Sequence, residues 1–128
     1  MTALSDRHIE LLKGHNFGVI ATVGENGRLQ TSVVWVDTDG ENVLVNTTNK
    51  RAKGRNLRTS PRVSISIWNN EDPYTYFEVE GPVELVDDGA DEHISELSRR
   101  YDGKDFHTPV DRVIARIRPE RILNHGIF

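Results

Sequence analysis

The chain has 128 residues, of which 36% are hydrophobic and 28% are charged, and its net charge is −4. This length suits one domain with one core, which we expect to span residues 1–128, and the composition is that of a soluble globular protein rather than a disordered or fibrous one. No apolar run approaches the roughly 20 residues that a membrane-spanning helix needs, and the first residues lack the basic and apolar regions of a signal peptide. The absence of cysteine excludes disulfides, thiolate nucleophiles and cysteine metal ligands, and it is compatible with the cytoplasmic location that we expect.

The first predicted elements are a short helix and a β-hairpin. A helix over residues 5–13 is predicted from the serine that can cap its start and the glycine that follows its end. Residues 17–23 are mostly apolar and β-branched, which is typical of a strand. The residues 24–27, GENG, predict a turn, and the alternation of side chains over residues 28–36 predicts a second strand.

The middle of the chain predicts two more strands with a basic segment between them. A second turn at residues 37–40 leads to a third strand at 42–48. We expect a short helix or helical turn next, which Pro61 ends because the residue before a proline disfavours helix. Residues 62–68 alternate apolar and polar side chains, as a half-buried strand does.

The last predicted elements are a long strand, a helix and a closing strand. Residues 74–86 predict the long strand, with a bulge or bend at Gly81 and Pro82. A helix is expected over residues 91–101 and a strand over 112–118. The predicted fold is therefore mainly β, a six-stranded antiparallel sheet with short helices. Such a sheet commonly closes into a barrel, which removes exposed edges.

The strongest chemical signal is the basic segment, residues 50–62, which reads KRAKGRNLRTSPR. It contains six basic residues and no acidic one, whereas all 20 acidic residues lie elsewhere in the chain. In a helix, Arg51, Arg55 and Arg58 would share one face, and Lys53 and Asn56 a second. These side chains are suitable donors to phosphate oxygens, and the segment indicates a local anion site. A solvated basic face is the alternative interpretation.

Two further groups of residues are candidates for ligand contacts. The predicted second strand alternates polar and apolar side chains from Gln30 to Trp35, and such a strand can lie along a flat heteroaromatic ring. The alternative is a strand that has one solvent-exposed face and carries Trp35 in the core. The aromatic residues Trp68, Tyr74 and Tyr76 surround a polar loop and suit a ligand wall, a subunit contact or ordinary barrel packing.

The sequence singles out no catalytic residue or metal ligand. The five histidines show no metal-ligand spacing, and we place His93 on an exposed helix face. There is no nucleophile elbow, no Rossmann motif and no Walker lysine loop. A redox enzyme is consistent with this lack, because its cofactor supplies the chemistry.

Several blocks of the sequence resemble the pyridoxamine 5′-phosphate oxidase-like, FMN-binding split-barrel superfamily, and within it the branch that depends on the deazaflavin coenzyme F420. In chain order they are GVIATVGENGRLQTSVVWV, a D-x-D-G turn, NVLVNTT, RAKGRNLRTSPRVSISI and EVEGPVEL, and the closing RVIARIRPERI also fits. The blocks cover roughly residues 5 to 87, and R-x-K-x-R-N-L-x-x-x-P-R is their most specific part.

The resemblance implies a split barrel that forms a homodimer, with two cofactor sites at the subunit interface. The implied cofactor-binding residues are Gln30, Ser32, Val33, Val34, Thr47, Thr48, Arg51, Lys53, Arg55, Asn56 and Tyr74. Those up to Val34 would lie along the ring system, and the two threonines would touch the ribityl chain or the phosphate. The basic residues and the asparagine would hold the phosphate, and the tyrosine would come from the partner subunit.

The activity that the resemblance implies is hydride transfer from reduced coenzyme F420 to an unsaturated small organic acceptor such as a quinone, a tetrapyrrole-like molecule or an enone. The chain lacks the basic C-terminal region with which pyridoxamine phosphate oxidases hold their substrate, which argues against the vitamin B6 reaction. Val33 and Trp35 stand where relatives frequently carry polar residues, so FMN is the alternative cofactor. A cofactor-binding protein without turnover is a further alternative. A nucleic-acid-binding barrel is disfavoured because the basic segment contains no aromatic residue.

Overall fold

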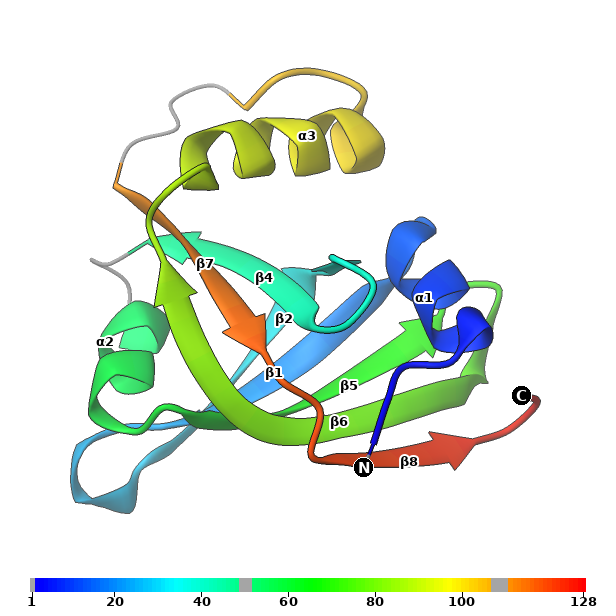
Figure 1. The fold of residues 1–128 in the computed structure, drawn as a ribbon, viewed down its shortest axis with the longest axis horizontal. Coiled ribbons are helices and arrows are strands. Elements are labelled where there is room, and N and C mark those ends of the chain that lie inside the picture. Colours follow the sequence, from blue (N-terminus) through cyan, green and yellow to red (C-terminus); the bar gives the residue numbers. More distant parts are fainter. Residues whose placement is uncertain (1, 49–51, 107–110) are drawn as a thin grey trace.

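The computed structural model describes residues 2–48, 52–106 and 111–128. These residues form one curled antiparallel sheet with three α-helices packed around it (Figure 1). The elements in chain order are α1 (Asp6–Lys13), β1 (Phe17–Val23), a 3-10 turn (Glu25–Gly27), β2 (Leu29–Trp35), β3 (Asp37–Thr38), β4 (Val43–Thr48), α2 (Ala52–Thr59), β5 (Arg62–Asn69), β6 (Asp72–Val86), α3 (Ala90–Asp102), β7 (Arg112–Ile117) and β8 (Arg121–His125).

The sheet has the strand order β2-β1-β5-β6-β7-β4-β3, and β8 pairs with β6. This arrangement confirms the prediction of a mainly β, antiparallel fold with short helices. The described residues contain eight strands rather than six, so the predicted number is wrong. The two missed strands lack the usual signal: β3 has only two residues and lies where a turn was expected, and β8 shows no alternation of buried and exposed residues.

The long strand β6 joins the two parts of the sheet. It pairs with β5 as far as Pro82 and with β7 from Val83 onward, and Figure 1 shows it strongly curved. Gly81 lies at this change of partner, where a Cβ atom would stand 1.8 Å from the carbonyl oxygen of Arg118. The glycine is needed because the backbone of the connection after β7 approaches it so closely, which explains the bend that the sequence predicts there.

The helix α1 packs at one end of the sheet (Figure 1), and its first turn is well capped. The hydroxyl of Ser5 accepts a hydrogen bond from the backbone N–H of His8, and the backbone N–H of Ser5 donates to Nδ1 of the His8 ring. The Nε2 atom of the same ring lies 2.7 Å from Oδ1 of Asn124 on β8. Leu11 and Leu12 of the same helix are buried in the core, so α1 is fixed both to the core and to β8.

The core lies inside the curled sheet, and the helix α3 packs against the outer surface of the sheet. Large, fully buried side chains from β1, β4, β5, β6 and β7 fill the interior, among them Ile20, Val45, Ile65, Phe77 and Ile117. On α3, Ile94, Leu97 and Tyr101 form a second apolar cluster against Phe17, Trp35 and Phe106. Figure 1 shows α3 lying across the end of the sheet that carries β4 and β7.

The strands β2 and β3 are the two ends of the strand order. The sheet therefore has an open edge at β2, which lies near β4 without pairing with it in the described residues. None of the helices within the described ranges is long and apolar enough to cross a membrane.

Candidate functional site

The helix α2 separates its basic side chains into an inner and an outer set. Lys53 is buried against the sheet beside Leu57, while Arg55 and Arg58 are exposed. This is the two-faced helix that the spacing of the basic segment predicts. Arg51, which was expected on the outer face, lies outside the described residues.

Asn56 connects α2 to the strand expected to lie along a cofactor ring. Its amide nitrogen Nδ2 donates to Oε1 of Gln30 at 3.0 Å and to the hydroxyl of Thr22 at 3.1 Å. Two residues from separate predicted groups, Gln30 and Asn56, are therefore in direct contact. Gly24 leaves room for this contact, because a Cβ atom there would stand 2.9 Å from Oδ1 of Asn56.

The contact lies beside a surface depression of about 610 Å³, which we call the basic depression. Its lining residues are Gly24, Glu25, Asn26, Arg28, Leu29, Gln30, Arg55, Asn56 and Thr59. Two arginines and three side-chain amides line the depression together with one glutamate. The depression is thus suited to an anionic, strongly hydrogen-bonding ligand group such as a phosphate.

A second depression, of about 240 Å³, lies beyond the basic depression along β2, and we call it the α3 pocket. Its lining residues are Val33, Val34, Trp35, Asn46, Lys53, Ile94, Leu97, Phe106 and Arg112. It therefore brings together residues of β2, β4, α2, α3 and β7. Six of the nine lining residues are aromatic or aliphatic, and no acidic residue is among them.

Thr47 has a buried side-chain hydroxyl without a hydrogen-bond partner among the described residues. Its side chain is 1% exposed, and its hydroxyl finds no hydrogen-bond partner within the part of the chain that the structure describes. An unpaired buried hydroxyl is costly and rare in proteins. Thr47 lies near the end of β4, on the buried face of that strand with Val43 and Val45, and it lines neither depression.

The remaining predicted site residues are placed in different ways. Ser32 and Thr48 are half-buried and line neither of the two depressions. On β2, Val34 points inward and is buried, whereas Val33 is 68% exposed. Tyr74 is 86% exposed at the start of β6 and also lines neither depression. Its predicted role concerns the partner subunit's copy and stays a prediction.

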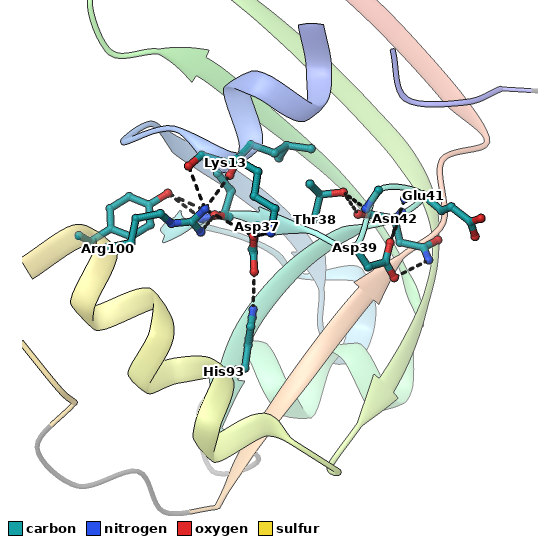
Figure 2. A network of polar contacts seen from close by, with 12 residues as sticks. Lys13, Asp37, Thr38, Asp39, Glu41, Asn42, His93 and Arg100 are labelled. Atoms are coloured by element: carbon teal, nitrogen blue, oxygen red, sulfur yellow. Dashed lines mark hydrogen bonds and ion pairs between the residues drawn. The ribbon is translucent and has the colours of Figure 1, made fainter. Parts of the chain in front are cut away.

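The structure also shows a buried polar network that the sequence analysis missed (Figure 2). Its centre is Asp37 on β3, which lies 3.0 Å from Nε2 of His93 on α3. Lys13 of α1 is also 3.0 Å from the Asp37 carboxylate, and Arg100 of α3 is 3.4 Å from it. The expectation that His93 is exposed is wrong, since the residue is only 8% exposed.

The charge of Asp37 is stabilised by this network. Burial would raise the pKa of its carboxyl group, because the charged form loses water. Hydrogen bonds from His93 and Lys13, a further one from the backbone of Thr38 and the nearby Arg100 outweigh that effect. The pKa of Asp37 is consequently held well below its usual range.

Sequence reasoning missed this network because its members are far apart in the chain. Asp37 was assigned to a hairpin turn, although the turn lies after it, where Asp39 accepts hydrogen bonds from the backbone of Glu41 and Asn42. One local signal was present. Asn46, whose Nδ2 lies 3.1 Å from Nδ1 of His93, is a polar residue in the middle of the strand β4. No group of three or more His, Asp or Glu side chains within the described ranges is placed to hold a metal ion.

The residues present fit a cofactor with an anionic tail and a flat ring. The basic depression offers cationic and amide donors for the tail, and β2 runs from it toward the α3 pocket, so that a ring could lie along the strand between the two.

Comparisons with known proteins agree with this geometry. Residues 4–126 match the family model described as pyridoxamine 5′-phosphate oxidase. The chain is similar to a solved structure named F420 reductase, at 34% sequence identity and a TM-score of 0.81, over 94% of this chain and 98% of that one.

Two other solved structures show how widely the fold is used. A putative pyridoxamine 5′-phosphate oxidase from Listeria innocua has 22% identity and a TM-score of 0.74, over 93% of this chain and 95% of that one. The heme storage protein HutZ from Vibrio cholerae has 20% identity and a TM-score of 0.71, over 98% of this chain and 96% of that one. At these identities the likeness concerns the fold alone.

Proposed function

Because the chain belongs to the pyridoxamine 5′-phosphate oxidase family, we propose that it is an oxidoreductase that uses the deazaflavin coenzyme F420 to reduce an unsaturated small organic molecule. The likeness to the structure named F420 reductase, which extends over nearly the whole of both chains, supports the choice of cofactor.

The observation that carries the proposal is the contact between Asn56 and Gln30. It places the basic helix α2 directly beside β2, so that a phosphate held by α2 would leave the rest of the cofactor running along β2. A basic helix that only interacted with solvent would not need a buried lysine, and Lys53 is 7% exposed.

In this proposal the residues of the chain bind and orient the cofactor. Lys53, Arg55 and Asn56 would hold the phosphate, with Thr47 and Thr48 near the ribityl chain. Gln30, Ser32, Val33 and Val34 would lie along the ring system. A bound deazaflavin supplies a hydride carried at carbon. The aliphatic and aromatic side chains of the neighbouring α3 pocket would keep water away from the edge of the ring, and positioning of this kind accounts for much of the rate that such sites achieve.

A homodimer is part of the proposal, and the outer face of β2 supports it. Leu29 and Val33 are 76% and 68% exposed there. On β1 they pair with Val23 and Val19, which are half-buried. The more apolar face of this edge strand therefore points outward, and an exposed apolar patch of this kind is typical of a protein–protein interface.

The main alternative is FMN in place of the deazaflavin, since both carry a phosphate that the same residues would hold. The test is a titration of the purified chain with oxidised and reduced coenzyme F420 and, separately, with FMN, followed by fluorescence and binding heat. Preference for the deazaflavin supports the proposal. Preference for FMN replaces it with an ordinary flavoprotein, and binding of neither rejects the cofactor site.

Substitutions on α2 make the titration specific to the site. Lys53→Ala should weaken deazaflavin binding by about 1–3 kcal/mol, or about 5- to 150-fold, as expected for a lost charge-assisted contact. Arg55→Ala should also weaken it. Arg58→Ala is the matched control, because Arg58 is an exposed arginine of the same helix that lines neither depression. Thermal unfolding of each variant shows whether it is folded, and a folded Lys53→Ala variant with parental affinity would reject the phosphate assignment.

A further inference from the structure

The side-chain amide of Asn46 is held in one orientation, because one of its neighbours can only donate a hydrogen bond and another can only accept one. Its oxygen Oδ1 accepts a hydrogen bond at 2.7 Å from Nε of Arg112, and an arginine side chain can only donate. Its nitrogen Nδ2 donates at 2.8 Å to the carbonyl oxygen of Ala90, which can only accept. With the amide flipped, Nδ2 would face the donor of Arg112 and Oδ1 would face the carbonyl oxygen of Ala90, so the orientation of Asn46 is determined.

The orientation of Asn46 in turn determines the tautomer of His93. Nδ2 of Asn46 lies 3.1 Å from Nδ1 of His93 and donates to it, so Nδ1 is the acceptor of the ring. The ring proton is therefore on Nε2, which donates to Oδ2 of Asp37 at 3.0 Å. A continuous path of hydrogen bonds thus runs from Asp37 through His93 and Asn46 to Arg112.

The inner end of this path is fixed and the outer end lines a pocket. Asp37 is held by Lys13 from α1 and by Arg100 from α3 (Figure 2). At the other end, Asn46 and Arg112 both line the α3 pocket. The guanidinium carbon of Arg112 also lies 5.1 Å from the centre of the Phe106 ring, over its face. Residues of the helices α1 and α3 and of the strands β3 and β4 therefore help to hold Arg112 of β7 at the pocket wall.

The lining of the α3 pocket indicates the class of ligand that it would accept. Two cationic residues, Lys53 and Arg112, line the pocket, and no acidic residue is among those that do. The proposed function assigns Lys53 to the cofactor phosphate, so the positive charge for a second anion is that of Arg112. The other walls are Trp35, Phe106 and aliphatic side chains. Its volume of about 240 Å³ is below the roughly 300–1,000 Å³ of typical small-molecule sites, so it suits a small flat ring system with an anionic oxygen.

We propose that the α3 pocket binds the carboxylate or enolate oxygen of an unsaturated, ring-containing acceptor through Arg112, and that Asp37 and His93 are positioning residues that hold Asn46 and Arg112 for this purpose. That the bound anion is the acceptor to be reduced rests on the proposed function. The anion preference and the positioning path rest on the geometry alone.

The anion preference is tested with 2-naphthoate and its neutral counterpart 2-naphthamide, titrated by calorimetry into the full chain without cofactor. We expect the carboxylate to bind at least about 10-fold more tightly than the amide. Arg112→Gln should reduce this preference to less than about 2-fold. Arg116→Gln is the matched control, since Arg116 is another β7 arginine but does not line the α3 pocket, and it should keep the parental preference. Equal binding of the two compounds by the parent would overturn the anion site.

The positioning role is tested with His93→Leu, which removes both hydrogen bonds of the ring. We expect it to lose most of the preference for 2-naphthoate and to shift and broaden the NMR signal of the Arg112 Nε–H group. His93→Asn keeps an acceptor near the Nδ1 position and should restore part of both. Val63→Ala, which creates a small cavity in the core away from the pocket, controls for general destabilisation and should change neither. Parental preference and an unchanged Arg112 signal in His93→Leu would overturn the positioning role.

A competition experiment separates this inference from the proposed function. If coenzyme F420 and 2-naphthoate bind together, the pocket lies beside the cofactor and the inference stands. Displacement of 2-naphthoate by the deazaflavin would instead assign the pocket to the cofactor and overturn the acceptor site. Selective binding of 2-naphthoate by a chain that binds no deazaflavin would keep the anion site and reject the proposed function.

Discussion

His93 donates a hydrogen bond from Nε2 to Oδ2 of Asp37 across 3.0 Å, which joins the helix α3 to the two-residue strand β3. Because Lys13 of α1 reaches the same carboxylate, three elements that are far apart in the sequence meet at one buried charge. Removing that charge should therefore affect stability more than a change at an exposed aspartate.

We expect Asp37→Asn to destabilise the protein by about 2–4 kcal/mol. Breaking a buried ion pair costs about 3–5 kcal/mol because the remaining partner stays charged. The value here is lower because the Lys13 side chain is 56% exposed and can regain water. Urea unfolding at pH 7 measures the change. Asp88→Asn, at an exposed position, is the control and should stay within about 0.5 kcal/mol of the parent.

The same carboxylate should make the parent protein sensitive to acid. The pKa of Asp37 is lower in the folded chain than the value of about 3.9 expected when it is unfolded. As the pH falls, the unfolded chain therefore binds the proton first. The stabilisation by Asp37 is complete above about pH 4 and is lost as the pH falls toward the folded pKa. Unfolding curves between about pH 5 and 2 should show a smaller loss of stability in Asp37→Asn than in the parent, and parallel curves would contradict the expectation.

Gly81→Ala should be one of the most destabilising single-methyl additions in the sheet. The new Cβ atom would stand 1.8 Å from the backbone oxygen of Arg118, which cannot move away as a flexible side chain would. We expect a loss of about 3 kcal/mol or more, at the upper end of overpacking effects, measured by thermal and urea unfolding. Glu80→Ala, at the adjacent exposed position of the same strand, should be nearly neutral.

Val33→Asp should weaken the proposed homodimer. It would place a charge on the exposed apolar face of β2, and a buried, unpaired charge at an interface is costly. Light scattering and sedimentation over a range of protein concentrations measure the mass. Val33→Ile, which keeps the position apolar and β-branched, should behave as the parent does. A parent chain that is monomeric at all concentrations would reject the dimer.

The regular strands and helices could be predicted from the sequence because local patterns determine them. The predicted strand at residues 17–23 agrees with β1, and the predicted helix at residues 91–101 lies within α3. In contrast, β3 consists of only Asp37 and Thr38, so no periodicity can appear in it. The strand β8 carries Leu123 exposed on one face, and its position is decided by pairing with β6 rather than by its own pattern.

The candidate site was predictable where its residues are close in sequence. Lys53, Arg55 and Asn56 follow one another on α2, and their clustering is visible without a structure. The contact between Asn46 and Arg112 joins residues 66 positions apart, and only the pairing of β4 with β7 brings them together. His93 appeared exposed because the pattern of α3 does not show that the helix packs a polar side chain against β3.

The contact between His8 and Asn124 has a consequence for the order of events during synthesis. The helix α1 leaves the ribosome early, but its partner on β8 is made 116 residues later. At about 5–20 residues per second, translation of this interval takes about 6–23 s. Throughout that time α1 lacks its anchor on β8. The strand β6 is complete only at residue 86, and from then until residues 112–125 are made it lacks β7 and β8, two of the strands that flank it. The growing chain therefore displays unpaired strand edges to its surroundings, and a chaperone that covers β6 would act in this interval.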